Sequence, residues 1–413
     1  MRILHTADLH IGQILYQYYD RFDEHAHFFG QLEAWCDEYR PDALLVSGDI
    51  FDIQQPSAAV KDFFNSSVVA LHRRFPDIRI VITAGNHDSA ARIQADREVW
   101  GLADVKLVGH GPASDVLEGG DGWQERFIVE LPSGFVVALP FMSSLRTEVV
   151  QSLLDAVALR NADGRPVVLM AHQAVTGSDL TGHGDIGNLR SSAIGELGSG
   201  YDYLALGHIH RPQTLGHPLA DEDEPRSSYG AGIARYSGSA LHVSGDERYP
   251  HTVSLVDIDR HGGTVELTRL RIDELRHFYI LPEPDCEPFG SSFEVYDAVD
   301  RFCADPGRGY IRLRVDAAAF ASLPSDFVQT IYRKLESTGN EVRFNPQTIC
   351  ENDAAEEAVA ERPVFELAEL QQMTNPLEFI RKTIDMYPEL NLDDLENDFR
   401  EIEEELLKGD QEK

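Results

Sequence analysis

The 413-residue chain has few basic side chains for its size. Lysine and arginine together number 36, of which only six are lysine, against 70 aspartate and glutamate residues, so the formal net charge is −34. A broad surface for nucleic acid needs clustered lysine and arginine to neutralise phosphates. The composition therefore excludes a protein that holds a polyanion by such a surface alone. If the protein binds a polyanion, the positive charge that neutralises it must come from another source.

Several other features are missing. The four cysteines (Cys36, Cys286, Cys303 and Cys350) form no C-x-x-C pair, so we expect reduced thiols and neither a disulfide framework nor a zinc ribbon. The N-terminal run reaches Asp8 too early for a signal peptide, and no apolar run is long enough to span a bilayer. The sequence contains no G-x-x-x-x-G-K-[ST] motif, so we do not expect an ATP-binding P-loop. These absences predict a cytoplasmic protein without a membrane segment.

Up to about residue 275, short apolar runs alternate with stretches of helical spacing. Segments 21–39 and 58–75 have the spacing of amphipathic helices, and 135–140 and 251–271 indicate additional strands. Five further runs are rich in Val, Ile and Leu and end close to Gly, Asp, Asn or His, as buried strands do: 2–5, 43–47, 78–83, 167–170 and 203–206. Strands that alternate with helices predict an α/β layered domain over residues 1–275.

The rest of the chain is predicted to form three further parts. Residues 276–350 combine strands (277–281, 310–315 and 341–344) with helices (293–303 and 325–338), as in a small α+β capping domain. Residues 351–362 are acidic and Ala-rich and predict a linker. Residues 363–413 predict a helical tail whose last helix, at about 392–408, is amphipathic and strongly acidic. Within the first domain, 176–200 and 220–232 predict solvated surface loops, the second of which carries the acidic run 221–224.

A cluster of polar residues follows each of the five short strands. In chain order the clusters are D-x-H (Asp8, His10), G-D (Asp49), G-N-H-D (Asn86, His87, Asp88), H (His172) and G-H-x-H (His208, His210). In α/β sheets, ligands collect beyond the carboxyl ends of strands, so we expect these residues to converge on one crevice. One such cluster alone is typical of a turn, but the ordered set of five indicates a functional site.

The residue types in these clusters indicate divalent metal ions. Carboxylate and amide oxygens with imidazole nitrogens suit Mn²⁺ or a similar borderline ion. One carboxylate can bridge two ions about 3.5–4 Å apart, as two-metal phosphoester hydrolysis needs. With Asp8 and Asp49 as the only anionic ligands, two such ions leave the site with a charge of about +2, which attracts phosphate and acidifies bound water. The metals would supply the positive charge that the composition lacks.

The five motifs together resemble the calcineurin-like metallophosphoesterase superfamily. The segments MRILHTADLHIGQ, VSGDIFD, AGNHDS, ALGHIHR and YSGS resemble its SbcD-type DNA nuclease subunits more closely, over roughly residues 1–275. The resemblance implies a layered sheet sandwich flanked by helices. It also implies a Mn²⁺-dependent DNA exonuclease and endonuclease that processes double-strand ends and hairpins in DNA repair and recombination.

The resemblance also implies roles for individual residues. The seven implied metal ligands form two sets that share the bridging carboxylate of Asp49: Asp8, His10, Asp49 and His210 for one ion, and Asp49, Asn86, His172 and His208 for the other. His87 would be the catalytic histidine that contacts the scissile phosphate, and Asp88 would orient its loop. Asp52 stands where some members of the family carry a further histidine.

Two other functions fit part of the pattern. A phosphodiesterase or phosphatase for small substrates could use the same core, although it would need neither a capping domain nor a tail. A DNA-end scaffold without catalysis would need neither His87 nor a complete ligand set.

Two partners are expected besides DNA. By resemblance, the helical tail would dock on an SbcC-type coiled-coil ATPase, with a helical hairpin packed within the chain as the alternative. Segment 58–75 carries more apolar residues than one buried face of a helix can hold, which favours burial of the others in a homodimer. The alternative is that all of them are buried within the monomer.

Overall fold

The computed structural model describes residues 1–16, 19–112, 122–181, 191–304, 307–316, 319, 323–338 and 342–351. The predicted linker beyond Glu351 and the whole predicted tail, 363–413, therefore lie outside the described residues. The chain divides into two units, which interleave along the sequence. The first comprises Met1–Leu281, Val299–Arg312 and Val328–Gln347, and the second comprises Pro282–Ala298, Leu313–Phe327 and Thr348–Lys413. All the predicted site residues belong to the first unit.

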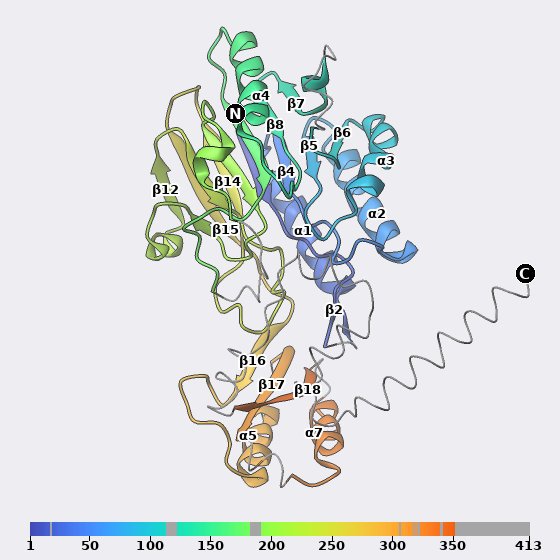
Figure 1. Ribbon diagram of the computed structural model, residues 1–413. Coiled ribbons are helices and arrows are strands. Elements are labelled where there is room, and N and C mark those ends of the chain that lie inside the picture. Colours follow the sequence, from blue (N-terminus) through green and yellow to red (C-terminus); the bar gives the residue numbers. More distant parts are fainter. Residues whose placement is uncertain are drawn as a thin grey trace, which may run out of the picture. The chain divides into compact units, whose positions relative to one another are not determined.

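Two mixed sheets form the centre of the first unit (Figure 1). The first sheet has the order β12 (Arg226–Tyr229), β15 (Val265–Arg271), β14 (Thr252–Ile258), β1 (Arg2–Thr6), β4 (Ala43–Ser47), β5 (Arg79–Thr83) and β6 (Val105–Val108). The second has the order β11 (Gln213–Thr214), β13 (Ile233–Tyr236), β10 (Tyr203–Gly207), β9 (Val167–His172), β8 (Gly134–Ala138) and β7 (Ile128–Leu131). The strands β1, β4, β5 and β6 are parallel to one another, as are β8, β9, β10 and β13. The short strands β2 (Ile14–Leu15) and β3 (Tyr19–Asp20) pair antiparallel.

Alternate residues of the parallel strands enter two separate cores. In β4, Ala43 and Leu45 join a buried cluster with the strands of the second sheet, whereas Leu44 and Val46 join a cluster with the helices. This period of two is what a strand buried on both faces requires. Helices α1 (Phe22–Tyr39), α2 (Ala58–Arg74) and α3 (Ala90–Gly101) cover the first sheet, and α4 (Thr147–Arg160) packs on the second (Figure 1).

The predicted α/β layered class is confirmed. The expected strands at 43–47 and 277–281 have the observed bounds, and the other strands and helices expected within the described residues are present with shifted ends. Helices α3 and α4 and strands β6, β7, β12 and β13 have no counterpart among the expected elements. Of the predicted capping region, β16 (His277–Leu281), β17 (Gly309–Asp316) and β18 (Val342–Glu351) form a three-stranded sheet, and α5 (Ser292–Ala304) and α7 (Phe327–Glu336) are helical. The domain boundaries themselves stay a prediction.

The apolar excess of α2 is taken up within the chain. Val60, Phe64, Val68 and Leu71 are all buried. Phe63 packs its ring against aromatic rings of α1. The composition of this helix therefore gives no independent argument for a homodimer.

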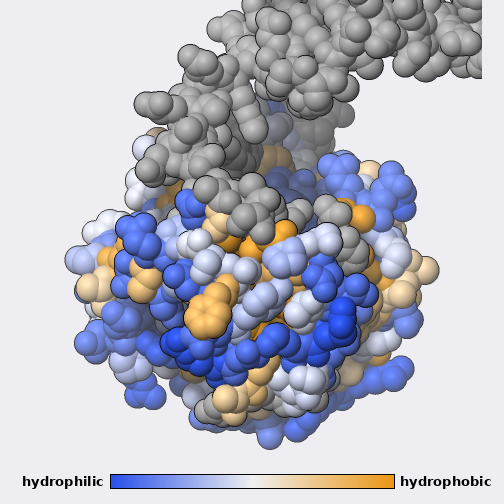
Figure 2. Space-filling view, turned by 90° about the horizontal axis from the view of Figure 1, so that it is seen from below, coloured by the Kyte–Doolittle hydropathy of each residue, from blue (hydrophilic) through white to orange (hydrophobic). Residues whose placement is uncertain are grey.

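The surface is consistent with the charge of the chain. Hydrophilic residues make up most of the described surface visible in Figure 2, with hydrophobic residues in small groups between them. Within the described ranges, no helix combines the length and the apolar character needed to cross a membrane.

The expectation that the whole acidic run 221–224 is solvated is wrong at one position. Glu222 accepts hydrogen bonds from Arg235 Nη1 at 2.8 Å and from Arg269 Nε at 2.9 Å. Both arginine side chains are buried, so this one carboxylate is the ion-pair partner of two guanidinium groups that water does not reach. The pattern of the sequence could not reveal this, because the two partners come from distant strands, β13 and β15.

We expect Glu222→Ala to lower the free energy of unfolding by about 3–5 kcal/mol, because it leaves buried charge without a partner. Glu224→Ala removes an exposed side chain from the same run and should change stability by less than about 0.5 kcal/mol. Urea unfolding of both variants checks this. Equal stability of the two variants would show that the Glu222 network carries no net stabilisation.

Candidate metal centre

The predicted site residues lie where five parallel strands end. Asp8 and His10 follow β1, Asp49 follows β4, and Asn86, His87 and Asp88 follow β5. His172 is the last residue of β9, and His208 and His210 follow β10. The first three strands belong to one sheet and the last two to the other, so the site joins the carboxyl ends of both sheets.

The backbone at the site adopts an uncommon conformation. Seven described residues other than glycine have positive φ, and four of them are predicted metal ligands: Asp8 (51°), His10 (46°), Asp49 (48°) and His208 (102°). Positive φ is costly for residues with a Cβ and persists where surrounding structure enforces it, typically at functional sites. This clustering supports a functional role for the four residues, independently of their side-chain chemistry.

Two motif glycines allow the loops to approach one another. A Cβ on Gly85 would overlap the Asp49 carboxylate, and a Cβ on Gly207 would overlap the Ser47 carbonyl. The glycines of G-N-H-D and G-H-x-H therefore serve close packing between neighbouring strand ends.

One group of donor atoms forms around His10. The Nε2 atoms of His10 and His210 are 3.3 Å apart, and Asp8 offers a carboxylate oxygen within 4.8 Å of both rings. The Asp8 carboxylate also accepts the His208 main-chain N–H at 3.0 Å, which fixes its position. The ring of His210 is oriented from its other side, because its Nδ1 lies 2.9 Å from Glu247 Oε1.

A second group forms around His172. Its Nε2 lies 3.0 Å from Asn86 Oδ1 and 3.3 Å from Asp49 Oδ2. The Ser47 carbonyl, which can only accept, lies 2.8 Å from His172 Nδ1, so Nδ1 carries a hydrogen and Nε2 is the nitrogen that faces the group. His208 Nδ1 approaches the same Asn86 oxygen at 2.8 Å.

Asp49 faces both groups with the same oxygen. Its Oδ2 lies 3.3 Å from His172 Nε2 and 3.9 Å from His10 Nε2. Its other oxygen accepts the His87 main-chain N–H at 2.8 Å. The carboxylate is therefore held between the two groups, which is the position that a bridging ligand needs.

Burial and charge show that these groups fit cations. Burial raises the pKa of Asp8 to about 6, although the neighbouring His172 opposes the shift. Burial alone would lower the pKa of His172, but Asp49 and Asp8 outweigh it and raise that pKa to about 9. Two buried carboxylates thus draw positive charge into the cluster, and oxygen and imidazole donors suit divalent ions of the Mn²⁺ kind.

His87 differs from the predicted ligands because its side chain is exposed. Its Nδ1 lies 2.8 Å from the Asp52 main-chain oxygen, which can only accept, so Nδ1 carries a hydrogen and Nε2 is left for a substrate. The Asp52 carboxylate lies 3.5 Å from His10 Nδ1. Asp52 therefore contacts a predicted ligand through its side chain and His87 through its main chain.

Asp88 is buried and connects two of the loops. Its carboxylate accepts main-chain N–H groups from Gly85 at 2.8 Å and from Ile50 and Phe51 at 3.0 Å. It lies behind the G-N-H-D turn and the G-D loop, where it orients both of them.

Glu247 is the residue of the site that the sequence did not reveal. It is buried, one of its oxygens contacts His210 Nδ1, and the other accepts the Val243 main-chain N–H. Burial raises the pKa of Glu247 to about 8. No motif marks it, because one glutamate among 70 acidic residues carries no signal of its own.

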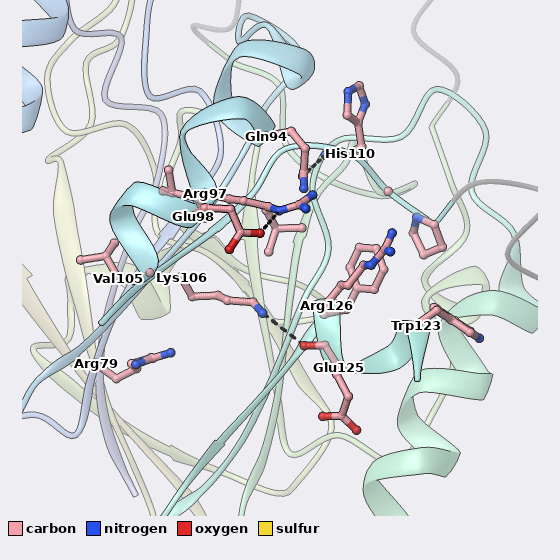
Figure 3. A pocket seen from close by; sticks show the side chains of 16 residues that line it. Arg79, Gln94, Arg97, Glu98, Val105, Lys106, His110, Trp123, Glu125 and Arg126 are labelled. Carbon is pink, nitrogen blue, oxygen red and sulfur yellow. Dashed lines mark hydrogen bonds and ion pairs between the residues drawn. The ribbon is translucent and has the colours of Figure 1, made fainter. Parts of the chain in front are cut away.

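A large cavity lies elsewhere in the first unit (Figure 3). It has a volume of about 690 Å³ and is lined by β6, α3 and the turn at 122–127, including Lys106, Arg126 and Trp123. None of the predicted site residues lines it. Among the described residues, metal-ligating side chains do not gather at this cavity as they do at the strand ends, so the candidate site is the metal centre.

Known proteins resemble the chain over this region. The family model described as calcineurin-like phosphoesterase matches residues 1–212. The SbcD component of the nuclease SbcCD from Escherichia coli (strain K12) is 29% identical over 278 residues, which covers 62% of this chain and 65% of that protein. Its counterpart in Rhodobacter capsulatus is 30% identical over 293 residues, covering 62% of this chain and 66% of that protein.

A third relative carries a different name. The DNA double-strand break repair protein Mre11 of Aeropyrum pernix is 27% identical over 223 residues, covering 51% of this chain and 49% of that protein. The chain thus spans about two-thirds, at most, of the length of these relatives. Since the family model spans more than half of the chain and includes every strand end of the metal centre, the chain belongs to the calcineurin-like phosphoesterase family.

Proposed function

We propose that the chain is a Mn²⁺-dependent DNA exonuclease and endonuclease that processes double-strand ends and hairpins. The observation that carries the proposal is the single Asp49 oxygen that faces both donor groups, with the exposed His87 beside them. The names of the relatives, a nuclease component and a DNA double-strand break repair protein, favour DNA as the substrate. A cytoplasmic location is part of the proposal and is supported by the described cysteines, which are free thiols.

We assign metal-binding, phosphate-contacting and positioning roles to the residues of the site. Asp8, His10, Asp49 and His210 would hold one ion, and Asp49, Asn86, His172 and His208 the other. When bound, such a pair supplies Lewis acidity and an acidified water for phosphoester hydrolysis. His87 would contact the scissile phosphate through Nε2 and, when protonated there, donate to the departing sugar oxygen. Asp88 and Asp52 would keep the His87 loop in place through the contacts described above.

Digestion of end-labelled duplex DNA by the purified full-length chain, beside a chromogenic small phosphodiester, tests the proposal. We expect Mn²⁺-dependent shortening and hairpin opening of the DNA, abolished by a chelator. Cleavage of the small phosphodiester alone would favour a small-substrate phosphodiesterase. DNA binding without cleavage of either substrate would favour a non-catalytic scaffold.

His87→Ala should lower the rate of DNA cleavage by at least about 100-fold, because a positioned general acid contributes that much or more. The bound metal should be unchanged, since His87 is not among the proposed ligands. Asp49→Ala should lose both ions together. The exposed His110 provides the control, and His110→Ala should cleave normally. A near-normal rate for His87→Ala would refute the assigned mechanism.

We also propose that residues 363–413, which the sequence predicts to be helical, bind an SbcC-type coiled-coil ATPase. The support is the acidic, amphipathic sequence of the last helix and the name of the relatives, which makes each of them one component of a nuclease. Such a partner would bring to the DNA the basic surface that this chain lacks.

Deletion of residues 363–413 should leave Mn²⁺-dependent cleavage of short DNA intact and abolish binding of the ATPase. Cleavage assays and pull-down with the purified ATPase measure the two effects. Full affinity of the truncated chain for the ATPase would show that the tail is not the docking segment.

A homodimer is a further proposal, which rests on α3 and not on α2. Val99 and Leu102, at the end of α3, are 70% and 91% exposed. Large apolar side chains that are exposed close together are typical of an interaction surface. Helices α2 and α3 lie together, since Lys61 Nζ and Asp96 Oδ2 are 3.0 Å apart.

Val99→Asp should convert a dimer to a monomer in sedimentation velocity, because it places charge in an apolar contact. Leu159 on α4 is 87% exposed, and Leu159→Asp is the matched control that should leave the mass unchanged. If the parent chain and both variants sediment as monomers, the dimer is refuted.

A further inference from the structure

Three buried side chains meet behind His210, outside the two ligand groups. His242, Glu247 and His251 are 8%, 2% and 1% exposed, and their donor atoms lie within 4.8 Å of one another. His251 Nε2 is 3.1 Å from His242 Nδ1 and 3.4 Å from Glu247 Oε2. The nature of this contact depends on where the hydrogens are.

His251 presents a lone pair to the other two residues. Its Nδ1 lies 2.9 Å from the Ser239 carbonyl, which can only accept. The Ser239 hydroxyl also accepts here, because it donates its own hydrogen to the Leu241 carbonyl. Nδ1 therefore carries the hydrogen of His251, and burial keeps the pKa of this ring far below its usual value, so Nε2 is unprotonated.

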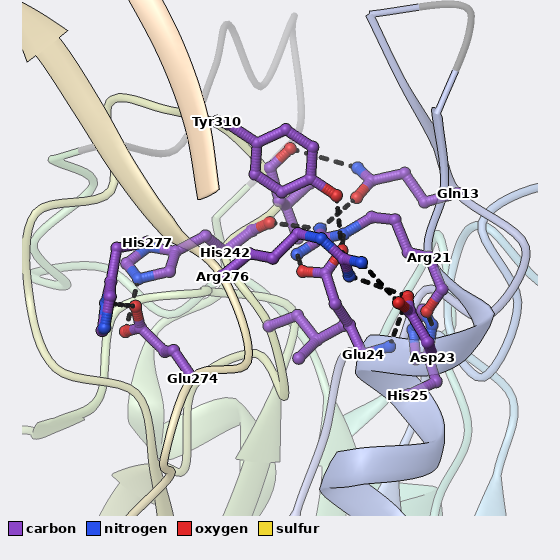
Figure 4. Close-up of polar contacts among 12 residues, drawn as sticks. Gln13, Arg21, Asp23, Glu24, His25, His242, Glu274, Arg276, His277 and Tyr310 are labelled. Atoms are coloured by element: carbon purple, nitrogen blue, oxygen red, sulfur yellow. Dashed lines mark hydrogen bonds and ion pairs between the residues drawn. The ribbon is translucent and has the colours of Figure 1, made fainter. Parts of the chain in front are cut away.

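His242 presents a lone pair as well when it is neutral. Its Nε2 lies 2.7 Å from Glu274 Oε1, and the other oxygen of Glu274 faces His277 (Figure 4). Burial would raise the pKa of Glu274, but these two histidines lower it, so the carboxylate is ionised and only accepts. Nε2 of His242 therefore carries the hydrogen, and Nδ1 faces His251 with its lone pair.

When Glu247 is ionised, three acceptor atoms face one another without a hydrogen between them. Burial opposes this ionisation, and a bound cation would favour it. A second proton on His242 would satisfy its contact with His251 but would leave Glu247 Oε2 facing the same nitrogen. One cation between the three atoms satisfies every contact. Each histidine also donates its outer N–H to an oxygen, as metal-bound histidines nearly always do.

The spacing and the charge balance fit a zinc ion. With Zn–N bonds of about 2.0–2.1 Å, neighbouring ligands of a tetrahedral site are about 3.3 Å apart. The observed separations of 3.1 and 3.4 Å lie on either side of that value. Glu247 and Glu274 balance the ion's two charges, and the nearby Arg21 guanidinium is already paired with Glu24 at 2.7 Å.

We propose that His242, Glu247 and His251 bind a Zn²⁺ ion, separate from the two ions of the metal centre. Glu247 would bind it through Oε2 while Oε1 accepts from His210 Nδ1. The ion would therefore hold Glu247 in the position that orients His210. It would also tie the segment between β13 and β14 to Glu274. This proposal does not depend on the proposed nuclease activity.

Metal analysis of the purified full-length chain tests the proposal. The chain is loaded with Zn²⁺ and then dialysed against Mn²⁺, and the ions per chain are counted by mass spectrometry. We expect three ions in the parent chain, one of them zinc, and two in His251→Gln, with the zinc lost. His5→Gln alters another fully buried histidine that contacts no cluster and should retain all three. A parent chain that binds no more ions than His251→Gln, or zinc retained at the same level by His251→Gln, would overturn the proposal.

Zinc X-ray absorption of the parent chain covers the case in which His251→Gln does not fold. Two imidazole nitrogens and a carboxylate oxygen at bonding distance from zinc are expected. A spectrum of hydrated zinc without imidazole ligands would overturn the proposal in the same way.

Discussion

The metal centre depends on two carboxylates, Asp8 and Asp49, that are removed from water at the meeting edge of two sheets. Ionised carboxylates in such surroundings are costly unless positive charge compensates them. The side chains around them supply imidazole nitrogens and an amide oxygen. His172 Nε2, for example, lies 3.3 Å from Asp49 Oδ2. Asp8, His10 and Asp49 have positive φ, so the backbone adopts the costly left-handed conformation at the positions that carry these side chains. Stability alone does not explain so much strain and buried charge in one place, whereas cation binding does.

The same constraint bears on the proposed DNA substrate, which the acidic composition of the chain alone would not attract. A chain with a net charge of −34 repels DNA at long range, within the limits that salt screening sets. Positive charge from metal ions in a buried centre would act at contact distance, where it would attract one phosphate group and leave the acidic surface unchanged. An ATPase partner with a basic surface would complete the arrangement, because it would hold the rest of the duplex.

The sequence predicts those parts of the site that have a local signature. Asp8, His10, Asp49, the G-N-H-D turn, His172 and the G-H-x-H turn each follow an apolar strand, and parallel strands bring such residues to one edge. Glu247 and Glu222 have no such signature, because their importance arises from distant partners: His210 for the first and two buried arginines for the second. The pairing of His242 with His251 is hidden for the same reason. These residues lie in loops or act through long-range contacts, and neither produces a periodic pattern in the sequence that could be recognised.

The fold shows the same division. The bounds of strand β4 are predictable because both of its faces are apolar, whereas β12, at the edge of the sheet, has the polar sequence RSSY and gives no strand signal. Helix α3 gives no clear helical signal because its apolar residues do not gather on one face. Only Ile93 and Trp100 are buried along its length.

We propose that Asp49 lies between two cations. Anomalous diffraction at the manganese edge, from crystals of the full-length chain grown with Mn²⁺, tests it directly. We predict two peaks about 3.5–4 Å apart, both within bonding distance of Asp49, one beside His10 and His210 and the other beside His172 and His208. A single peak, or two peaks that Asp49 does not join, would contradict the account.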